Sequence, residues 1–159
     1  MSIELNEEVI ELLDREDSVK VLATSDEDGT PYAVVRPWLH RDGGKLVYLE
    51  PLESSRSNRN LVHALWFDRK VTVTVSDRDG RSWQIKGFPI KAHVCGPVFR
   101  RYYEQLRRLL GDVDLAAVWL IEPQELSNET LQTQQRHADE EHPFFRHLDR
   151  LTRQEATHA

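Results

Sequence analysis

Short β-type runs separated by Asp/Gly turns fill residues 19–94 and constrain the fold more than any other feature. The runs are Val19–Thr24, Tyr32–Leu39, Lys45–Leu49, Lys70–Val75 and Arg81–Val94, and the turns are Asp26–Gly29, Asp42–Gly44 and Asp77–Gly80. Runs rich in β-branched and aromatic residues, bounded by such turns, predict antiparallel strands joined as a meander. Gly87 and Pro89 interrupt the last run, which indicates a bend or bulge of the kind found in barrel walls.

Two helices are expected around these strands. Asn6, followed by two glutamates, is typical of a helix start, so residues 1–17 should contain an N-terminal helix. Pro97 can begin a second helix and Gly111 can close it, with apolar residues recurring at helical spacing over 97–110.

The end of the chain predicts one more strand and a tail. Leu115–Ile121 has the composition of a strand, and Pro123 should stop it because proline cannot donate to a sheet. Residues 123–159 are polar and predict a helical tail that packs on a partner through apolar anchors at Phe144, Phe145, Leu148 and Leu151.

These elements make one domain over residues 1–159, of the mainly β, α+β class. About six strands over 18–122, with a helix between the fifth and the last, predict a small antiparallel barrel, because closure removes exposed strand edges.

Composition excludes several classes of protein. A single cysteine, Cys95, excludes a disulfide scaffold, and its apolar neighbours predict a buried thiol without chemistry. The first residues lack a secretion signal and no run approaches a membrane span, so we expect a cytoplasmic protein. A net charge of −6 disfavours non-specific binding to nucleic acid.

The segment Ser54–Arg59 is the strongest candidate for a binding site. It follows a strand, contains three serines and two arginines in six residues, and leads into a short apolar helix. Hydroxyls, guanidinium groups and unpaired amides at a helix start are the groups that bind phosphate. The alternative is an ordinary helix cap with solvated arginines.

Other motifs in the sequence do not predict a functional site. His137, His142 and His147 recur every five residues, a spacing that does not align metal ligands on one helical face, so no metal site is predicted. His63 has no nucleophile elbow near it, and no glycine-rich dinucleotide fingerprint follows any strand.

In their order along the chain, these motifs resemble the FMN-binding split β-barrels related to pyridoxamine 5′-phosphate oxidase. The resemblance covers Val19–Ile121 and rests on Arg36-Pro37 at a strand end, the loop Ser54–Ser57 with Asn60-Leu61 after it, the Val/Thr strand and Gly87. It implies a six-stranded split barrel that forms a homodimer, with FMN at the subunit interface. Arg36 would reach the flavin phosphate, and Ser55 and Arg56 would lie in the phosphate loop.

The chain departs from the family pattern at two positions. Ser57 stands where a lysine commonly follows the loop arginine, and Ser82 stands where a glutamine is often found. Arg59 is a candidate to supply the missing charge. Trp38 and Trp83 are the favoured walls for a flavin ring, although a tryptophan in a small barrel more often belongs to the core. The candidate cofactor residues are therefore Arg36, Pro37, Trp38, Ser54, Ser55, Arg56, Ser57, Arg59, Asn60, Ser82 and Trp83.

The resemblance implies an FMN-dependent oxidoreductase acting on a small molecule or electron partner. Oxidation of pyridoxamine phosphate is not expected, because Tyr102, Tyr103 and Arg107 match the family's substrate helix only loosely and the tail lacks an arginine-rich closing segment. Two alternatives stay open: a non-catalytic module that binds flavin, deazaflavin or haem, and a dimeric structural protein with an empty pocket.

Overall fold

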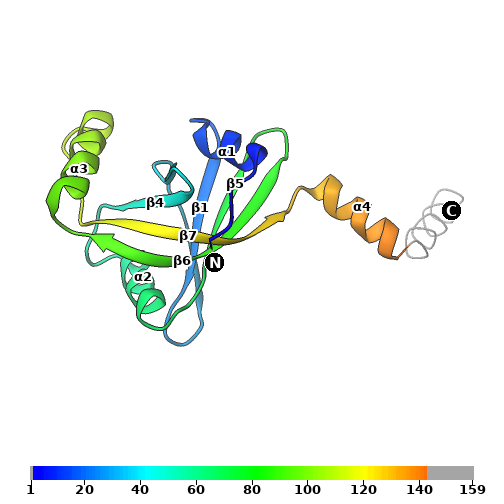
Figure 1. Cartoon of the computed structure of the whole chain (residues 1–159), viewed down its shortest axis with the longest axis horizontal. Helices are drawn as coiled ribbons and strands as arrows, with labels where there is room; N and C mark the ends of the chain where they lie inside the picture. Colours follow the sequence, from blue (N-terminus) through cyan, green and yellow to red (C-terminus); the bar gives the residue numbers. More distant parts are fainter. Residues whose placement is uncertain (1, 143–159) are drawn as a thin grey trace, which may run out of the picture.

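The computed structural model of the protein describes residues 2–142, which form one seven-stranded antiparallel sheet and four helices (Figure 1). In chain order the elements are α1 (Glu7–Asp14), β1 (Val19–Ser25), β2 (Pro31–Val35), β3 (His40–Asp42), β4 (Lys45–Glu50), α2 (Arg56–Trp66), β5 (Val71–Ser76), β6 (Ser82–His93), α3 (Gly96–Leu110), β7 (Ala117–Asn128) and α4 (Leu131–Glu141). The mainly β, α+β class expected from the sequence is confirmed.

The sheet is strongly curled but not closed. Its strand order is β2-β1-β5-β6-β7-β4-β3, so β2 and β3 form the two edges although they are consecutive in the chain. Only residues 36–39 join these edges, and an extended chain of that length spans at most about 18 Å. The edges therefore lie close together without pairing, in an open barrel rather than a closed one.

The prediction of six strands was wrong because the run Tyr32–Leu39 is broken in two. The Leu39 amide donates to the Arg36 carbonyl oxygen at 3.2 Å, which makes a turn where a continuous strand was expected. Pro37 lies in this turn and has no amide proton to contribute to a strand. The strands on either side of this turn then pair with different neighbours, β2 with β1 and β3 with β4.

The last strand is also longer than predicted, because Pro123 does not stop it. Pro123 faces Gly87 across the β6–β7 pair, where the register shifts. A bulge tolerates the missing donor of proline. Residues 124–128, assigned to the helical tail from sequence, therefore continue β7.

Helix α4 follows β7 and projects away from the sheet, with none of its residues buried (Figure 1). The apolar anchors predicted for the tail, at 144, 145, 148 and 151, lie outside the described residues.

Two apolar clusters hold the domain together. The larger fills the inside of the curled sheet and includes the buried face of α1, whose start is capped as predicted by Asn6 Oδ1 accepting from the Val9 amide at 2.8 Å. The smaller lies under α3, where Tyr102 and Leu106 pack on Val47 and Leu49 of β4. Strand β4 is thus buried on both faces, and its end is a rigid starting point for the loop before α2.

The β5–β6 turn depends on the carboxylate of Asp77. It accepts from the amides of Asp79 and Arg81, and it pairs with Arg81 Nε at 2.6 Å. Hydrogen bonding to the Arg81 side chain lowers the pKa of Asp77 below its ordinary value. The ionised form of Asp77 is therefore the one that the folded turn holds.

We expect Asp77→Asn to lower the thermal midpoint at pH 7, by an amount that shrinks as the pH falls below about 4. Because the folded pKa lies below the unfolded value of about 4, the carboxylate stabilises the fold above that pH and loses this effect as the pH falls through the folded value. Melting curves between pH 7 and pH 2.5 would measure this. Asp79→Asn, an exposed change in the same turn, is the control; equal midpoint losses by both variants would contradict the assignment.

Candidate functional site

The loop between β4 and α2 is held rigidly by its own polar side chains. Ser55 is the N-cap of α2, and its Oγ accepts from the Asn58 amide at 3.0 Å. Asn58 in turn donates to the Glu53 carbonyl at 3.0 Å and accepts from Trp119 Nε1 at 2.9 Å. Ser55 thus does what an ordinary cap does, and Asn58, which the sequence analysis did not single out, anchors the loop to β7.

The two arginines of this segment remain at the surface near the start of α2. Arg56 lies over the ring of Tyr32 at 5.5 Å, and Arg59 Nη2 donates to the Ser54 carbonyl at 3.5 Å. A surface hollow of about 300 Å³ lies beside them, lined by Asp26, Glu27, Arg56, Arg59, Asn60 and His63. The cations of the predicted phosphate loop therefore face two acidic side chains as well as solvent.

Arg36 occupies the end of the β2 edge, where its backbone amide donates to the Lys20 carbonyl at 2.9 Å. Its guanidinium lies over the Trp38 ring at 5.9 Å and donates from Nη1 to the Val35 carbonyl at 3.0 Å. Arg36 Nε is buried and has no hydrogen-bond partner among the described residues. A buried donor without a partner costs about 1–3 kcal/mol, so an anionic group that reached this nitrogen would relieve a real deficit.

Arg36 and Arg56 lie along one side of the β2 edge. The Arg56 guanidinium lies over the ring of Tyr32, which precedes Arg36 by four residues. Side chains at even separations along an extended strand point to the same face of the sheet. That separation is about 13 Å along the strand. Both side chains are long enough to reach toward the space between them.

Trp38 joins the turn that follows Arg36 to β4, the strand that carries Tyr48 and Glu50. Trp38 Nε1 donates to the Leu49 carbonyl at 2.8 Å, which ties the turn after β2 to β4. The Tyr48 hydroxyl donates to Glu50 Oε2 at 2.7 Å, with both side chains fully buried. Sequence reasoning missed Tyr48 and Glu50; the local signal was an acidic residue directly after the apolar run 46–49 of β4.

Ser57 and Asn60 face the interior instead of the solvent. Asn60 Nδ2 donates to Thr24 Oγ1 at 3.0 Å, a buried bond that fastens α2 to β1. Ser57 is 1% exposed, and its Oγ has no partner among the described residues. Pro37 and Ser54 are exposed in the turns on either side of this region.

Ser82 and Trp83 are not brought to Arg36 within one chain. They begin β6, which is separated from β2 by β1 and β5, or about 14 Å at ordinary strand spacing. The backbone of Ser82 is bonded to Glu129 and Thr130 before α4, and Trp83 packs against the larger core with Nε1 buried and unpartnered among the described residues.

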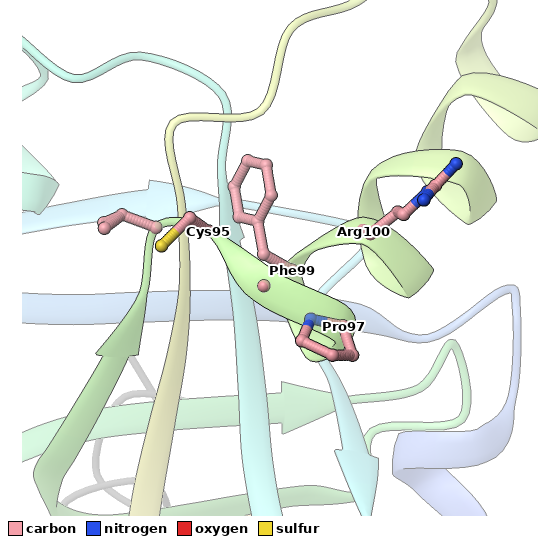
Figure 2. Close-up of a pocket in the computed structure, with 6 residues that line it drawn as sticks. Cys95, Pro97, Phe99 and Arg100 are labelled. Carbon is pink, nitrogen blue, oxygen red and sulfur yellow. The ribbon is translucent and has the colours of Figure 1, made fainter.

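A second hollow, of about 570 Å³, lies where β6 passes into α3 (Figure 2). Cys95 and Phe99 both line it, and Arg100 extends from the first turn of the helix. The prediction that Cys95 is buried was wrong, because the strand ends before this residue and leaves the thiol exposed at the helix start.

The residues expected on a substrate helix are bonded within the chain. The Tyr102 hydroxyl donates to Asp42 Oδ2 at 3.1 Å, and Arg107 donates to the Tyr103 hydroxyl at 2.6 Å and to Asp112 Oδ1 at 3.0 Å.

No group of three or more His, Cys, Asp or Glu side chains within residues 2–142 is arranged to hold a metal ion. None of the helices in that range is long and apolar enough to cross a membrane.

No protein-family model and no curated protein matches the sequence. Solved structures do match its fold. An F420 reductase superposes with a TM-score of 0.60 at 22% identity, covering 77% of this chain and 98% of that one. A candidate pyridoxamine 5′-phosphate oxidase from Lactobacillus delbrueckii has a TM-score of 0.61 at 19% identity, over 78% and 93% of the two chains.

The names of two further matching structures mention a cofactor. An FMN-binding protein from Syntrophomonas wolfei has a TM-score of 0.60 at 14% identity, over 78% of this chain and 88% of that one. The heme storage protein HutZ from Vibrio cholerae has a TM-score of 0.53 at 16% identity, over 79% and 95%. The chain therefore adopts the fold of the split barrels related to pyridoxamine 5′-phosphate oxidase.

Proposed function

We propose that this protein is a homodimeric flavoprotein that binds FMN, with the phosphate held between Arg36 and the start of α2. The observation that carries the proposal is the buried Nε of Arg36, unpartnered among the described residues, at the end of the β2 edge. The same edge carries Tyr32, whose ring contacts Arg56 at the capped start of α2. A guanidinium and the free amides of a helix start both donate hydrogen bonds to a phosphate group.

A second copy of the chain is proposed because the outer face of the β1–β2 edge is apolar and uncovered. Val19 and Val35 are 48% and 58% exposed, and Val21, Ala23 and Ala33 lie on the same outer face by strand alternation. Burying such a face is the ordinary driving force for dimer formation. A dimer would also add walls for a flavin ring to the one that Trp38 would provide.

When bound, the flavin ring would supply the redox chemistry. The protein's residues would bind and orient it: Arg36 and Arg56 toward the phosphate, and Trp38 toward the ring. We propose an oxidoreductase on this basis. Oxidation of pyridoxamine phosphate is not proposed, because Tyr102, Tyr103 and Arg107 are already engaged with residues of their own chain.

A non-catalytic module for deazaflavin or haem is the second candidate. It is favoured by the inward orientation of Ser57, which removes one hydroxyl from the phosphate loop, and by the acidic pair Asp26 and Glu27 beside Arg56. The names of two structural neighbours, an F420 reductase and a heme storage protein, are consistent with this range of cofactors on one fold.

Titration with FMN tests the proposed function. We expect quenching of FMN fluorescence that saturates at one flavin per chain, and a native mass spectrum of a dimer with two flavins. Rapid reduction of the bound flavin by a nicotinamide donor, followed by reoxidation, would support turnover. Absence of flavin binding, or a haem spectrum in the purified protein, would contradict the FMN proposal.

A further inference from the structure

Glu50 is a fully buried carboxylate at the end of β4, where the chain leaves the sheet for the loop before α2. Its Oε2 accepts from the hydroxyl of Tyr48, also fully buried, at 2.7 Å. Its Oε1 accepts from the Leu52 amide at 3.1 Å. Both carboxylate oxygens are thus used as acceptors, one toward the core and one toward the loop.

The backbone around Glu50 is held from two other sides. The Ala116 amide donates to the Glu50 carbonyl at 2.8 Å, and Trp38 Nε1 donates to the Leu49 carbonyl at 2.8 Å. These contacts come from the residue before β7 and from the turn after β2. The end of β4 is therefore a fixed reference point for whatever its side chains bind.

A series of hydrogen bonds leads from Glu50 to the start of α2. Leu52 donates its amide to the Glu50 carboxylate, and its carbonyl accepts from the Ser55 amide at 3.1 Å. Ser55 Oγ then accepts from the Asn58 amide at 3.0 Å. The Leu52 side chain is 60% exposed, so the hydrogen bond to Glu50, and not packing, holds this residue against the core.

A carboxylate is a costly way to fill a core position. Apolar residues of similar volume often give equal or greater stability in place of buried charged groups. A buried acceptor can, however, hold one amide in one place, because a hydrogen bond requires a narrow range of distance and angle.

We infer that Glu50, held by Tyr48, is a positioning residue for the anion-binding loop: by fixing the Leu52 amide, it sets where Ser55 and Arg56 meet the phosphate of the ligand. The inference rests on the proposed flavin site. Glu50 and Tyr48 act on the loop and do not touch the ligand themselves.

The first experiment measures amide hydrogen exchange of the unchanged protein without ligand, by NMR. The amides of Leu52 and Ser55 should exchange at least about tenfold more slowly, relative to their intrinsic rates, than those of Glu53 and Ser54. The latter two donate to no group among the described residues. Equal protection of all four amides would overturn the inference.

The second experiment uses the double variant Tyr48→Phe/Glu50→Leu, which removes both buried polar groups together and keeps both positions filled. Replacing both partners by apolar groups of similar shape leaves no unpaired core group, so the urea midpoint should be unchanged or higher. The ratio of FMN affinity to riboflavin affinity, from isothermal titration, should fall about threefold to tenfold, because the loop must then be ordered when the phosphate binds.

Two single variants are the controls. Glu50→Gln keeps a carbonyl that can accept from Leu52 and an amide that can donate to the Tyr48 hydroxyl, so it should keep the ratio within about twofold. Glu53→Gln changes an exposed acid of the same loop and should also leave the ratio within about twofold.

The outcomes separate this inference from the proposed function. If neither FMN nor riboflavin binds the unchanged protein, the flavin site is wrong and the positioning role falls with it. If both bind and the double variant keeps the ratio, only the role of Glu50 is wrong, whether or not the urea midpoint changes. If the double variant does not fold, the exchange rates of the unchanged protein support or overturn the inference.

Discussion

Replacing Arg36 with alanine is expected to weaken FMN binding by roughly 10- to 150-fold. Hydrogen bonds to charged groups contribute about 1.5–3 kcal/mol each, which corresponds to that range at 25 °C. Arg36 is the cation with a buried nitrogen that has no partner among the described residues, so the loss of a bound phosphate contact is not compensated by another group of the site. Isothermal titration with FMN and with riboflavin would show whether the loss depends on the phosphate.

The control for this prediction is Arg108→Ala, which removes an exposed arginine from the far part of α3. Its FMN affinity should match that of the unchanged protein. Arg56→Ala should have a smaller effect than Arg36→Ala, because Arg56 lies at the surface and its charge is screened by water. Equal FMN affinities for the Arg36→Ala and Arg108→Ala proteins would show that Arg36 does not contact the phosphate.

Replacing Gly87 with alanine is expected to destabilise the fold by about 1–3 kcal/mol, the usual range for forcing extra atoms into a packed interior. A Cβ at this position would lie 2.4 Å from the Glu122 carbonyl oxygen and 3.0 Å from the Glu122 carbonyl carbon. Both are backbone atoms of β7, at the register shift beside Pro123, so relief requires the strands to separate. Urea denaturation followed by fluorescence of the four tryptophans would measure the change.

Gly44→Ala is the matched control. A Cβ added to Gly44 meets nothing within 4 Å, and its backbone does not adopt the positive φ that favours glycine. Its stability should stay within about 0.5 kcal/mol of the unchanged protein. If Gly87→Ala were as mild as Gly44→Ala, the close approach of β6 and β7 would not be a real constraint on the fold.

Features whose signal is local were predictable from the sequence. Asn6 caps α1, Ser55 caps α2, and the helix predicted over 97–110 is α3, because capping and helical periodicity depend on residues within a few positions of one another. The hairpin turns follow the same rule, since Asp/Gly chemistry sets the turn before any pairing is known.

Features that depend on distant partners were not predictable. Pro37 breaks a strand and Pro123 does not, although a proline in a strand-like run is the same signal in both cases. The difference is that Pro123 meets Gly87 at a bulge, whereas Pro37 lies where the chain crosses between the two edges of the sheet. Gly87 lies far from Pro123 in the sequence, and the two sheet edges that Pro37 connects are set by pairing with other strands.

The candidate site divides in the same way. The sequence marked Arg36 and the segment 54–60, but it could not show that Ser57 faces the core, nor that Ser82 lies beyond two intervening strands. The burial of Glu50 was not predictable either, because it arises only when both faces of β4 are covered by residues far away in the chain.

The sequence by itself determined the starts of α1, α2 and α3, the Asp/Gly turns, and the presence of a helix start rich in hydroxyls and arginines. Each depends on hydrogen bonds and side-chain spacing within about one turn of chain. Only the tertiary structure decided that the sheet curls until its edges nearly meet, and which charges then oppose one another. Those outcomes depend on close packing between residues that are far apart in the chain, and local patterns carry no information about that packing.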